Sequence, residues 1–318
     1  MMEKRDVLYL VIPCYNEEAV LHETAKQLLE KMKSMFERNM ISEESKIMFV
    51  NDGSKDNTWD IIQELHESNP IYSGVKLSRN KGHQNALLAG LMTARKKADM
   101  VISLDADLQD DVDVIDKMVE KYYEGNDIVY GVRSARDTDT YFKKFTAEGF
   151  YKIMQAMGVE IVFNHADYRL MSKRALDGLS EFHEVNLFLR GIVPLIGYKS
   201  DVVTYERHER FAGESKYPLK KMIAFATDGI TSFSIKPIRM ITTCGFLIFT
   251  ISILMLLYFL VIHMLGKTVQ GWTSTVVSIW AIGGLQLLAI GVVGEYIGKI
   301  YLETKARPKY IIETVLDK

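Results

Sequence analysis

The spacing of apolar residues divides the chain into a first part of mixed character and a strongly apolar stretch further on. Five apolar runs rich in β-branched residues are typical of strands, at 7–12, 46–50, 72–77, 100–104 and 128–132. Between them, apolar positions recur with helical spacing, at about 18–37, 57–67, 83–97 and 112–123. Strands that alternate with helices predict an α/β domain with a mostly parallel sheet and right-handed crossovers.

Two long uncharged runs follow this domain. Residues 241–262 contain no charged side chain, and a helix of that length, at about 1.5 Å rise per residue, crosses a hydrocarbon core of ~30 Å. Residues 273–294 are also uncharged and nearly as apolar, and only a short connection separates the two runs. We therefore expect a hairpin of two transmembrane helices. Two buried helices of a soluble core would explain this length and lack of charge less well.

Positive charges indicate how the hairpin lies in the membrane. Lysine and arginine residues flank it on its terminal sides, at Lys236, Arg239, Lys299, Lys305, Arg307 and Lys309. The connection between the runs contains Lys267 as its single lysine or arginine. The positive-inside rule then places both termini and the first domain on the cytoplasmic side of the inner (plasma) membrane, in a multi-pass protein.

The segment before the first run combines lysines with apolar residues. Lys216, Lys220 and Lys221 stand beside Met222 and Phe225. This composition is typical of amphipathic helices on anionic headgroups, although an ordinary surface helix of the first domain explains it equally well. The expected organisation is a cytoplasmic domain at 1–215, juxtamembrane helices at 216–239, two transmembrane helices at 240–298 and a cytoplasmic C-terminal tail at 299–318.

Composition narrows the picture in two respects. The net charge of −2 over 318 residues does not favour a nucleic-acid partner. The two cysteines, Cys14 and Cys244, lie far apart in apolar surroundings. This cysteine usage fits a reducing compartment and excludes a disulfide framework.

An acidic motif follows the fourth predicted strand. Asp105 and Asp107 would point the same way in an extended segment, and two adjacent carboxylates repel each other unless a cation neutralises them. A hard divalent ion such as Mg²⁺ or Mn²⁺ prefers oxygen ligands and can bridge a diphosphate. We therefore expect Asp105 and Asp107 at a metal site. The next acidic residues, Asp110, Asp111 and Asp113, are explained as a solvated helix start.

Polar clusters also follow the first two predicted strands. Residues 13–18 end the first strand, and residues 51–58 end the second. Carboxyl ends of parallel strands open into the crevice where α/β proteins bind ligands, so the three clusters are expected at one edge of the sheet. Asp52 could accept hydrogen bonds from a base or ribose there, while a plain strand–turn–helix junction explains part of the second cluster.

These motifs, in this order and spacing, resemble family 2 glycosyltransferases. The resemblance rests on PCYNEE, VNDGSKDNT, NKGHQNAL and DADLQD. It extends to GVRSAR at 131–136, ADYRLMSKRAL at 166–176, LRGIVPLIGY at 189–198 and the basic, apolar stretch 209–239. Together with the expected hairpin, these segments are similar to the polyprenyl-phosphate glycosyltransferases, which include bactoprenol glucosyltransferases and relatives of dolichol-phosphate mannose synthase. The similarity covers nearly the whole chain.

The resemblance implies a GT-A, Rossmann-like fold and a reaction. The expected reaction moves a sugar with inversion from a UDP-sugar to undecaprenyl or another polyprenyl phosphate, with glucose favoured over N-acetylglucosamine. The product would be a β-linked lipid phosphate for cell-envelope glycosylation, and Mg²⁺ or Mn²⁺ would be the cofactor. A separate flippase and a homo-oligomer, such as a tetramer, are further partners that the resemblance implies.

The resemblance also assigns roles to residues. The nucleoside pocket would comprise Pro13, Tyr15, Glu17 and Asp52, and the metal with the donor diphosphate would be held by Asp105, Asp107 and Gln109. Asp167 would lie near the transferred sugar with Arg169 bracing it. Cations complete the site: Arg133, Arg136 and Lys143 or Lys144 for the acceptor phosphate, and Arg210 and Lys216 on a loop over the donor phosphates.

Chemistry and alternatives refine these roles. A phosphate acceptor is already ionised near neutral pH, so no strong base is needed, and we expect Asp167 to orient a sugar hydroxyl. His83 either contacts the donor or only caps the following helix.

The function has two alternatives. One is transfer to another lipid, such as a diacylglycerol, and the other is a non-catalytic membrane scaffold or nucleotide-sugar sensor. A processive polysaccharide synthase is disfavoured because no Gln-x-x-Arg-Trp pattern follows Arg190 and the expected spans number two.

Overall fold

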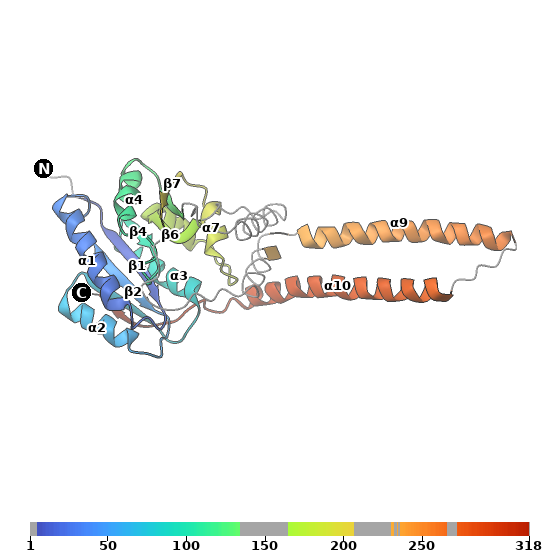
Figure 1. Cartoon of the computed structure of the whole chain (residues 1–318), viewed down its shortest axis with the longest axis horizontal. Helices are drawn as coiled ribbons and strands as arrows, with labels where there is room; N and C mark the ends of the chain where they lie inside the picture. Colours follow the sequence, from blue (N-terminus) through green and yellow to red (C-terminus); the bar gives the residue numbers. More distant parts are fainter. Residues whose placement is uncertain are drawn as a thin grey trace. The chain divides into compact units, whose positions relative to one another are not determined.

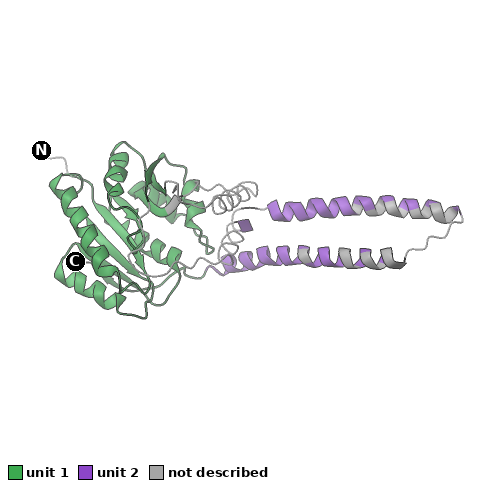
Figure 2. Ribbon diagram, viewed as in Figure 1, with its two compact units in different colours: residues 1–151, 160–218, 307–318 green, residues 152–159, 219–306 purple. Residues whose placement is uncertain are grey.

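The computed structural model describes residues 5–133, 165–206, 230–231, 234, 236–265 and 272–317. The chain forms two compact units, which are coloured separately in Figure 2. Unit 1 comprises residues 1–151, 160–218 and 307–318, and unit 2 comprises residues 152–159 and 219–306. The chain therefore leaves unit 1 twice, and the second excursion, residues 219–306, forms most of unit 2.

The five predicted strands and four predicted helices all form in unit 1 (Figure 1). The strands are β1 Leu8–Cys14, β2 Lys46–Asn51, β3 Tyr72–Leu77, β4 Met100–Ser103 and β5 Ile128–Arg133. The helices between them are α1 Leu21–Glu37, α2 Thr58–Ser68, α3 His83–Ala94 and α4 Val114–Tyr123. The predicted α/β fold is confirmed, with element ends shifted by a few residues.

Three further strands make the sheet mixed rather than mostly parallel. They are β6 His165–Ser172, β7 Ser200–Tyr205 and β8 Ile312–Leu316, in a sheet of order β7-β5-β6-β4-β1-β2-β3-β8. The strands β4, β1, β2 and β3 run parallel, whereas β6 lies antiparallel between β4 and β5. The expectation of a mostly parallel sheet is corrected accordingly. Two short helices, α6 Lys173–Ser180 and α7 Leu189–Leu195, lie between β6 and β7 in the chain.

The core of unit 1 forms around the central strands. Every residue of β1 is buried, as expected for a strand covered on both faces. The buried residues of α1 recur with helical spacing, at Leu21, Ala25, Leu28, Met32 and Met35. Each large apolar side chain buried in this way contributes about 1.5–3 kcal/mol to stability. Because this core fixes β1, β2 and β4, it also fixes where their polar carboxyl ends lie.

The C-terminal residues belong to the sheet. The sequence predicted a tail at 299–318, but residues up to Lys305 continue a helix and β8 pairs with β3 in antiparallel fashion. Ion pairs support this strand: Lys76 Nζ lies 2.9 Å from Glu313 Oε1, and Lys97 Nζ lies 2.7 Å from Asp317 Oδ2. The strand β8 thereby covers an edge of β3 that would otherwise present unpaired backbone groups.

Unit 2 contains two long helices that contact each other. They are α9 Lys236–Met264, with 29 residues, and α10 Trp272–Lys305, with 34 residues. Within the described part of the chain, one stretch, Ile282–Lys305, is long and apolar enough to cross a membrane. Most of the expected juxtamembrane segment 216–239 lies outside the described residues, and its last residues already form the start of α9.

Candidate active site

The polar loops that follow β1 and β2 are bonded to each other. The Asn16 N–H donates to Ser54 Oγ at 3.0 Å, and the Glu17 N–H donates to Thr58 Oγ1 at 2.9 Å. In return, the Lys55 N–H donates to Asn16 Oδ1 at 2.9 Å. The structure therefore brings two of the three predicted clusters together at one end of the sheet. Tyr15, predicted to line a nucleoside pocket, is 43% exposed in this loop.

Pro13 and Asp52 lie deeper than the loops around them. Pro13 is buried within β1, and Asp52, which follows β2, is 2% exposed. Asp52 Oδ1 accepts from the Lys81 N–H at 2.7 Å, and Oδ2 accepts from the Gly82 N–H at 2.9 Å. Burial raises the pKa of Asp52 and these two backbone donors lower it, with a net rise. Asp52 thus anchors the loop before α3, and a contact with the donor nucleoside stays a prediction.

A glycine allows this anchoring. Gly53 has φ +63°, in the left-handed region that favours glycine. A Cβ at this position would lie 2.5 Å from Asn80 N and 2.6 Å from the carbonyl carbon of Arg79. The loop after β2 can therefore approach the loop before α3 only because residue 53 has no side chain.

The acidic motif after β4 forms a tight turn. Asp107 and Gln109 are 8% and 9% exposed, and the Gln109 N–H donates to Asp107 Oδ1 at 3.2 Å. Leu108 between them has φ +56°. The Ala106 carbonyl accepts from Thr24 Oγ1 at 2.7 Å, which ties the turn to α1. The motif is thus held by backbone geometry, with its first carboxylate, Asp105, more exposed.

Burial and neighbouring carboxylates both raise the pKa of Asp105. Desolvation raises its pKa, the neighbouring His83 lowers it, and the carboxylates of Asp110, Asp167 and Asp107 raise it again, to about 6. Carboxylates that repel one another in this way favour a cation between them. A divalent metal ion bound at the motif would relieve this repulsion.

The ligand set fits a metal that is shared with a substrate. Among the residues that the structure describes, no three His, Cys, Asp or Glu side chains are grouped so as to hold a metal ion. Mg²⁺ commonly binds through one or two carboxylates together with substrate phosphates. Asp105 and Asp107, with the Gln109 amide beside them, match that smaller set. A metal held by all three, as the sequence predicts, stays a prediction.

Asp167 on β6 is contacted by two arginines and lies close to a histidine. Arg169 Nη2 donates to Asp167 Oδ1 at 2.8 Å. Arg190 on α7 donates from Nε to Oδ1 at 3.3 Å and from Nη2 to Oδ2 at 3.1 Å. His83 Nε2 lies 3.5 Å from Asp167 Oδ2 and 3.8 Å from Asp105 Oδ1. Asp167 therefore connects the start of α3 with α7 and borders the acidic motif.

The pKa of Asp167 follows from these contacts. Burial alone would raise it, but the His83 hydrogen bond and the Arg190 and Arg169 charges hold it well below its usual range. These contacts therefore favour the ionised form of Asp167. A carboxylate of low basicity is a poor general base, and the role of Asp167 near the transferred sugar stays a prediction.

Of the cations predicted to bind the acceptor phosphate, Arg133 is the one that lies within the described residues. Arg133 at the end of β5 donates to the Tyr205 hydroxyl at 3.2 Å, and its Nη2 lies 3.4 Å from Asp110 Oδ1. The Tyr205 hydroxyl also donates to Asp110. The structure thus binds Arg133 to Asp110 and Tyr205. The other predicted cations lie outside the described residues: Arg136, Lys143, Lys144, Arg210 and Lys216.

Sequence reasoning missed Arg190 and left the role of His83 open. Arg190 stands alone in the apolar segment LFLRGIVPLIG. A single charge in such a segment needs a partner of opposite charge once the segment packs, and this was the available signal. The partner, Asp167, is 23 residues away in the chain and could not be identified without the fold.

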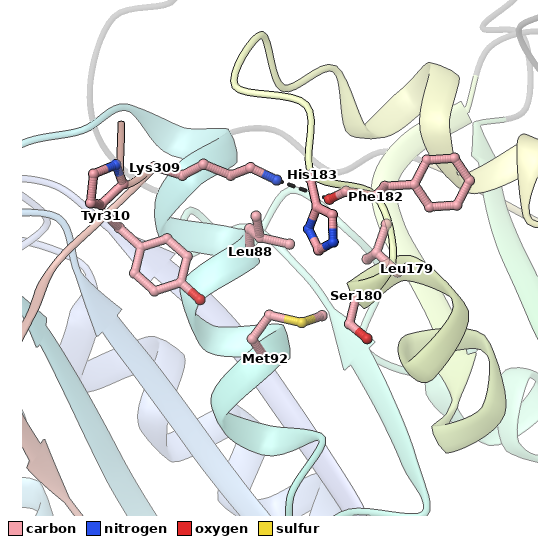
Figure 3. A pocket seen from close by; sticks show the side chains of 9 residues that line it. Leu88, Met92, Leu179, Ser180, Phe182, His183, Lys309 and Tyr310 are labelled. Atoms are coloured by element: carbon pink, nitrogen blue, oxygen red, sulfur yellow. Dashed lines mark hydrogen bonds between the residues drawn. The ribbon is translucent and has the colours of Figure 1, made fainter. Parts of the chain in front are cut away.

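A separate hollow of about 370 Å³ lies on unit 1 (Figure 3). Its lining comes from α3, the end of α6 and the segment before β8, namely Leu88, Met92, Leu179, Ser180, Phe182, His183, Pro308, Lys309 and Tyr310. Lys309 Nζ donates to the Phe182 carbonyl at 3.0 Å across it (Figure 3). None of the predicted site residues lines this hollow, so it is distinct from the acidic motif.

Known proteins resemble this chain over both units. A model of the family "Glycosyl transferase family 2" matches residues 9–179. The uncharacterized glycosyltransferase YkoT of Bacillus subtilis (strain 168) is 53% identical over 98% of this chain and 93% of its own length. The bactoprenol glucosyl transferase of Shigella phage SfX is 41% identical over 96% and 98%. The prophage bactoprenol glucosyl transferase homolog of Escherichia coli (strain K12) is 40% identical over 96% and 98%.

Proposed function

The chain belongs to glycosyltransferase family 2 and is a glycosyltransferase, and on that premise we propose that it transfers a sugar from a UDP-sugar to a polyprenyl phosphate. Transfer inverts the anomeric configuration, with glucose the favoured sugar and N-acetylglucosamine the next. The observation that carries the acceptor assignment is the similarity to bactoprenol glucosyl transferases at about 40% identity, which extends through both units.

The site in unit 1 supports a nucleotide-sugar donor. Loops after β1 and β2 are hydrogen-bonded to each other, and the acidic turn follows β4, which lies directly beside β1 in the sheet. Asp105 and Asp107 would hold Mg²⁺ or Mn²⁺ together with the donor diphosphate. A metal bound there would neutralise charge on the departing diphosphate. An ionised phosphate acceptor needs no base. The contribution of the protein is therefore to position both substrates for direct displacement.

The way the chain connects the two units supports a membrane hairpin. Residues 160–218 and 307–318 both belong to unit 1, and the second of these segments contains β8, which pairs with β3. Unit 1 lies on one side of any membrane, so the chain between these points crosses it an even number of times. If α10 spans, α9 spans as well, which is the two-helix arrangement expected from the uncharged runs.

Exposed apolar side chains in unit 2 support the same proposal. Phe246 on α9 is 72% exposed, and Leu287 and Ile290 on α10 are 71% and 67% exposed. Large apolar patches in contact with water are uncommon in soluble monomers, whereas lipid covers them readily. The lysines and arginines that flank the helices support the proposal of a multi-pass inner-membrane protein with unit 1 and both termini on the cytoplasmic side. Assembly into oligomers and a separate flippase remain expectations of the family resemblance.

The test is sugar transfer by the purified full-length protein to undecaprenyl phosphate. Radiolabelled UDP- and GDP-sugars are supplied singly, with Mg²⁺, with Mn²⁺ or with a chelator. We expect metal-dependent product from one UDP-sugar and none from an Asp107→Asn variant of unchanged thermal stability. Product on diacylglycerol instead of the lipid phosphate, or nucleotide binding with no product from any donor, would contradict the proposed function.

A further inference from the structure

The side chains around Asp167 differ in their exposure to solvent. Arg169 is 1% exposed, so its guanidinium contacts Asp167 and is shielded from solvent. The Arg190 side chain is 34% exposed and the His83 side chain is 42% exposed, although both are held against the same carboxylate. Arg190 therefore combines two features of a ligand-binding arginine: a fixed orientation and access to solvent.

The orientation of Arg190 is set from two directions. Asp167 accepts from its Nε and Nη2 atoms, so the plane of the guanidinium is fixed by two hydrogen bonds. The helix that carries Arg190 is fixed separately, because the Leu189 N–H donates to Gln84 Oε1 on α3 at 2.9 Å. Both constraints come from well-packed elements of unit 1, and together they leave the guanidinium little freedom.

Charge and position make phosphate the matching ligand chemistry. Asp167 places one negative charge against the two guanidinium groups of Arg169 and Arg190. His83, which touches Asp167, also lies 3.8 Å from Asp105, the first carboxylate of the acidic motif. This group of side chains thus borders the place proposed for a metal-bound diphosphate. A planar arginine fork matches phosphate oxygens, and such contacts stabilise charge on a departing diphosphate.

We propose that Arg190 binds a phosphate oxyanion of the substrates, and that Asp167 is the positioning residue that orients Arg190 for this contact. The proposal rests on the proposed function for the identity of the substrates. The oxyanion belongs either to the donor diphosphate or to the acceptor phosphate, since both meet at the site of transfer. Asp167 then contributes to turnover through Arg190, with no proton transfer of its own.

The experiment separates the two sources and does not depend on turnover alone. UDP binding with Mn²⁺ is measured by calorimetry for the full-length protein and for Arg190→Gln, Arg190→Lys, Asp167→Asn and the Asp167→Asn/Arg190→Gln double variant. The KM for undecaprenyl phosphate is measured at saturating donor wherever turnover remains. Arg174→Gln is the matched control, because Arg174 is an exposed arginine paired with Asp127 and lies outside the site.

We expect Arg190→Gln to weaken one of these affinities by about tenfold or more, as for other charge-assisted bonds, and Arg190→Lys to recover part of the loss. A loss in UDP binding assigns the donor diphosphate, and a raised lipid KM alone assigns the acceptor phosphate. Asp167→Asn should cause a smaller loss, and the double variant should bind no worse than Arg190→Gln, since the two residues act together.

Two results would overturn the proposal. One is an Arg190→Gln protein, as stable to heat as Arg174→Gln, with wild-type affinity for both UDP and the lipid phosphate. The other is a double variant whose losses simply add, which would mean that Asp167 does not act through Arg190. Absence of transfer to undecaprenyl phosphate by the wild-type protein would instead count against the proposed function, because UDP binding is measured without acceptor.

Discussion

The close approach at Gly53 can be tested with a single methyl group. The Gly53→Ala change places a Cβ 2.5 Å from Asn80 N and 2.6 Å from the carbonyl carbon of Arg79. Both are backbone atoms, so neither can rotate away as a side-chain tip would. The same change places alanine at φ +63°, a conformation that L-residues rarely adopt. The variant therefore combines backbone strain with a steric clash.

A second glycine separates these two costs. Gly125 has φ +86°, and a Cβ there would meet nothing within 4 Å. Gly125→Ala should cost only the strain of a left-handed residue, about 1–2 kcal/mol. Gly53→Ala should cost that amount and a further ~1–3 kcal/mol for forcing the two loops apart. The difference between the variants isolates the contact between the loop after β2 and the loop before α3.

Thermal unfolding of the purified protein in detergent, followed by intrinsic fluorescence, measures both variants. With about 2–4 °C of Tm per kcal/mol for a unit of this size, Gly53→Ala should melt about 2–12 °C below Gly125→Ala. UDP affinity should fall in Gly53→Ala alone, because separation of the loops loosens the hydrogen bonds from Lys81 and Gly82 to Asp52. Equal Tm values for the two variants would refute the reasoning.

Three further results are expected. Because protons compete with metal for a carboxylate of pKa about 6, Mn²⁺ affinity, measured by calorimetry in the presence of UDP, should fall as the pH drops through 6 and be flatter in Asp105→Asn. Ser172 accepts from the Ala175 N–H at the start of α6, so Ser172→Ala should lower the unfolding free energy by about 0.5–2 kcal/mol, seen as a lower Tm. Leu316 in β8 packs partly against the core, so Leu316→Ala should cost ~1 kcal/mol in the same assay; an unchanged Tm would mean that β8 adds no stability.

The part of the sheet that was predicted from sequence is the part built from continuous apolar runs. Strands β1 to β5 each contain such a run, since strands covered on both faces need apolar residues at successive positions. Strand β6 was missed because Asp167 and Arg169 interrupt its apolar pattern, although both are drawn into the fold by their ion pair. Strand β7 was missed because exposed residues alternate along most of it.

The site, like the sheet, was predicted from the sequence only in part. The clusters after β1, β2 and β4 were expected at one edge because parallel strands end together, and the bonds between the first two clusters agree with that expectation. Arg190 could not be placed, because its position depends on α7 folding back against β6 and α3. Chain order predicts which loops share an edge, but not which later helix supplies the remaining charge.

The aspartates predicted for the site differ in how their charges are balanced, and this difference determines what each can do. Asp52 and Asp167 have both carboxylate oxygens engaged by donors of the protein itself, from backbone N–H groups in one case and arginines in the other. A carboxylate already neutralised by two arginines has little affinity left for a proton or a metal. Asp105, by contrast, has a raised pKa among other carboxylates. We therefore expect a metal to bind at the acidic turn after β4, and the proposal for Asp167 is that it influences the reaction through the arginine that it orients.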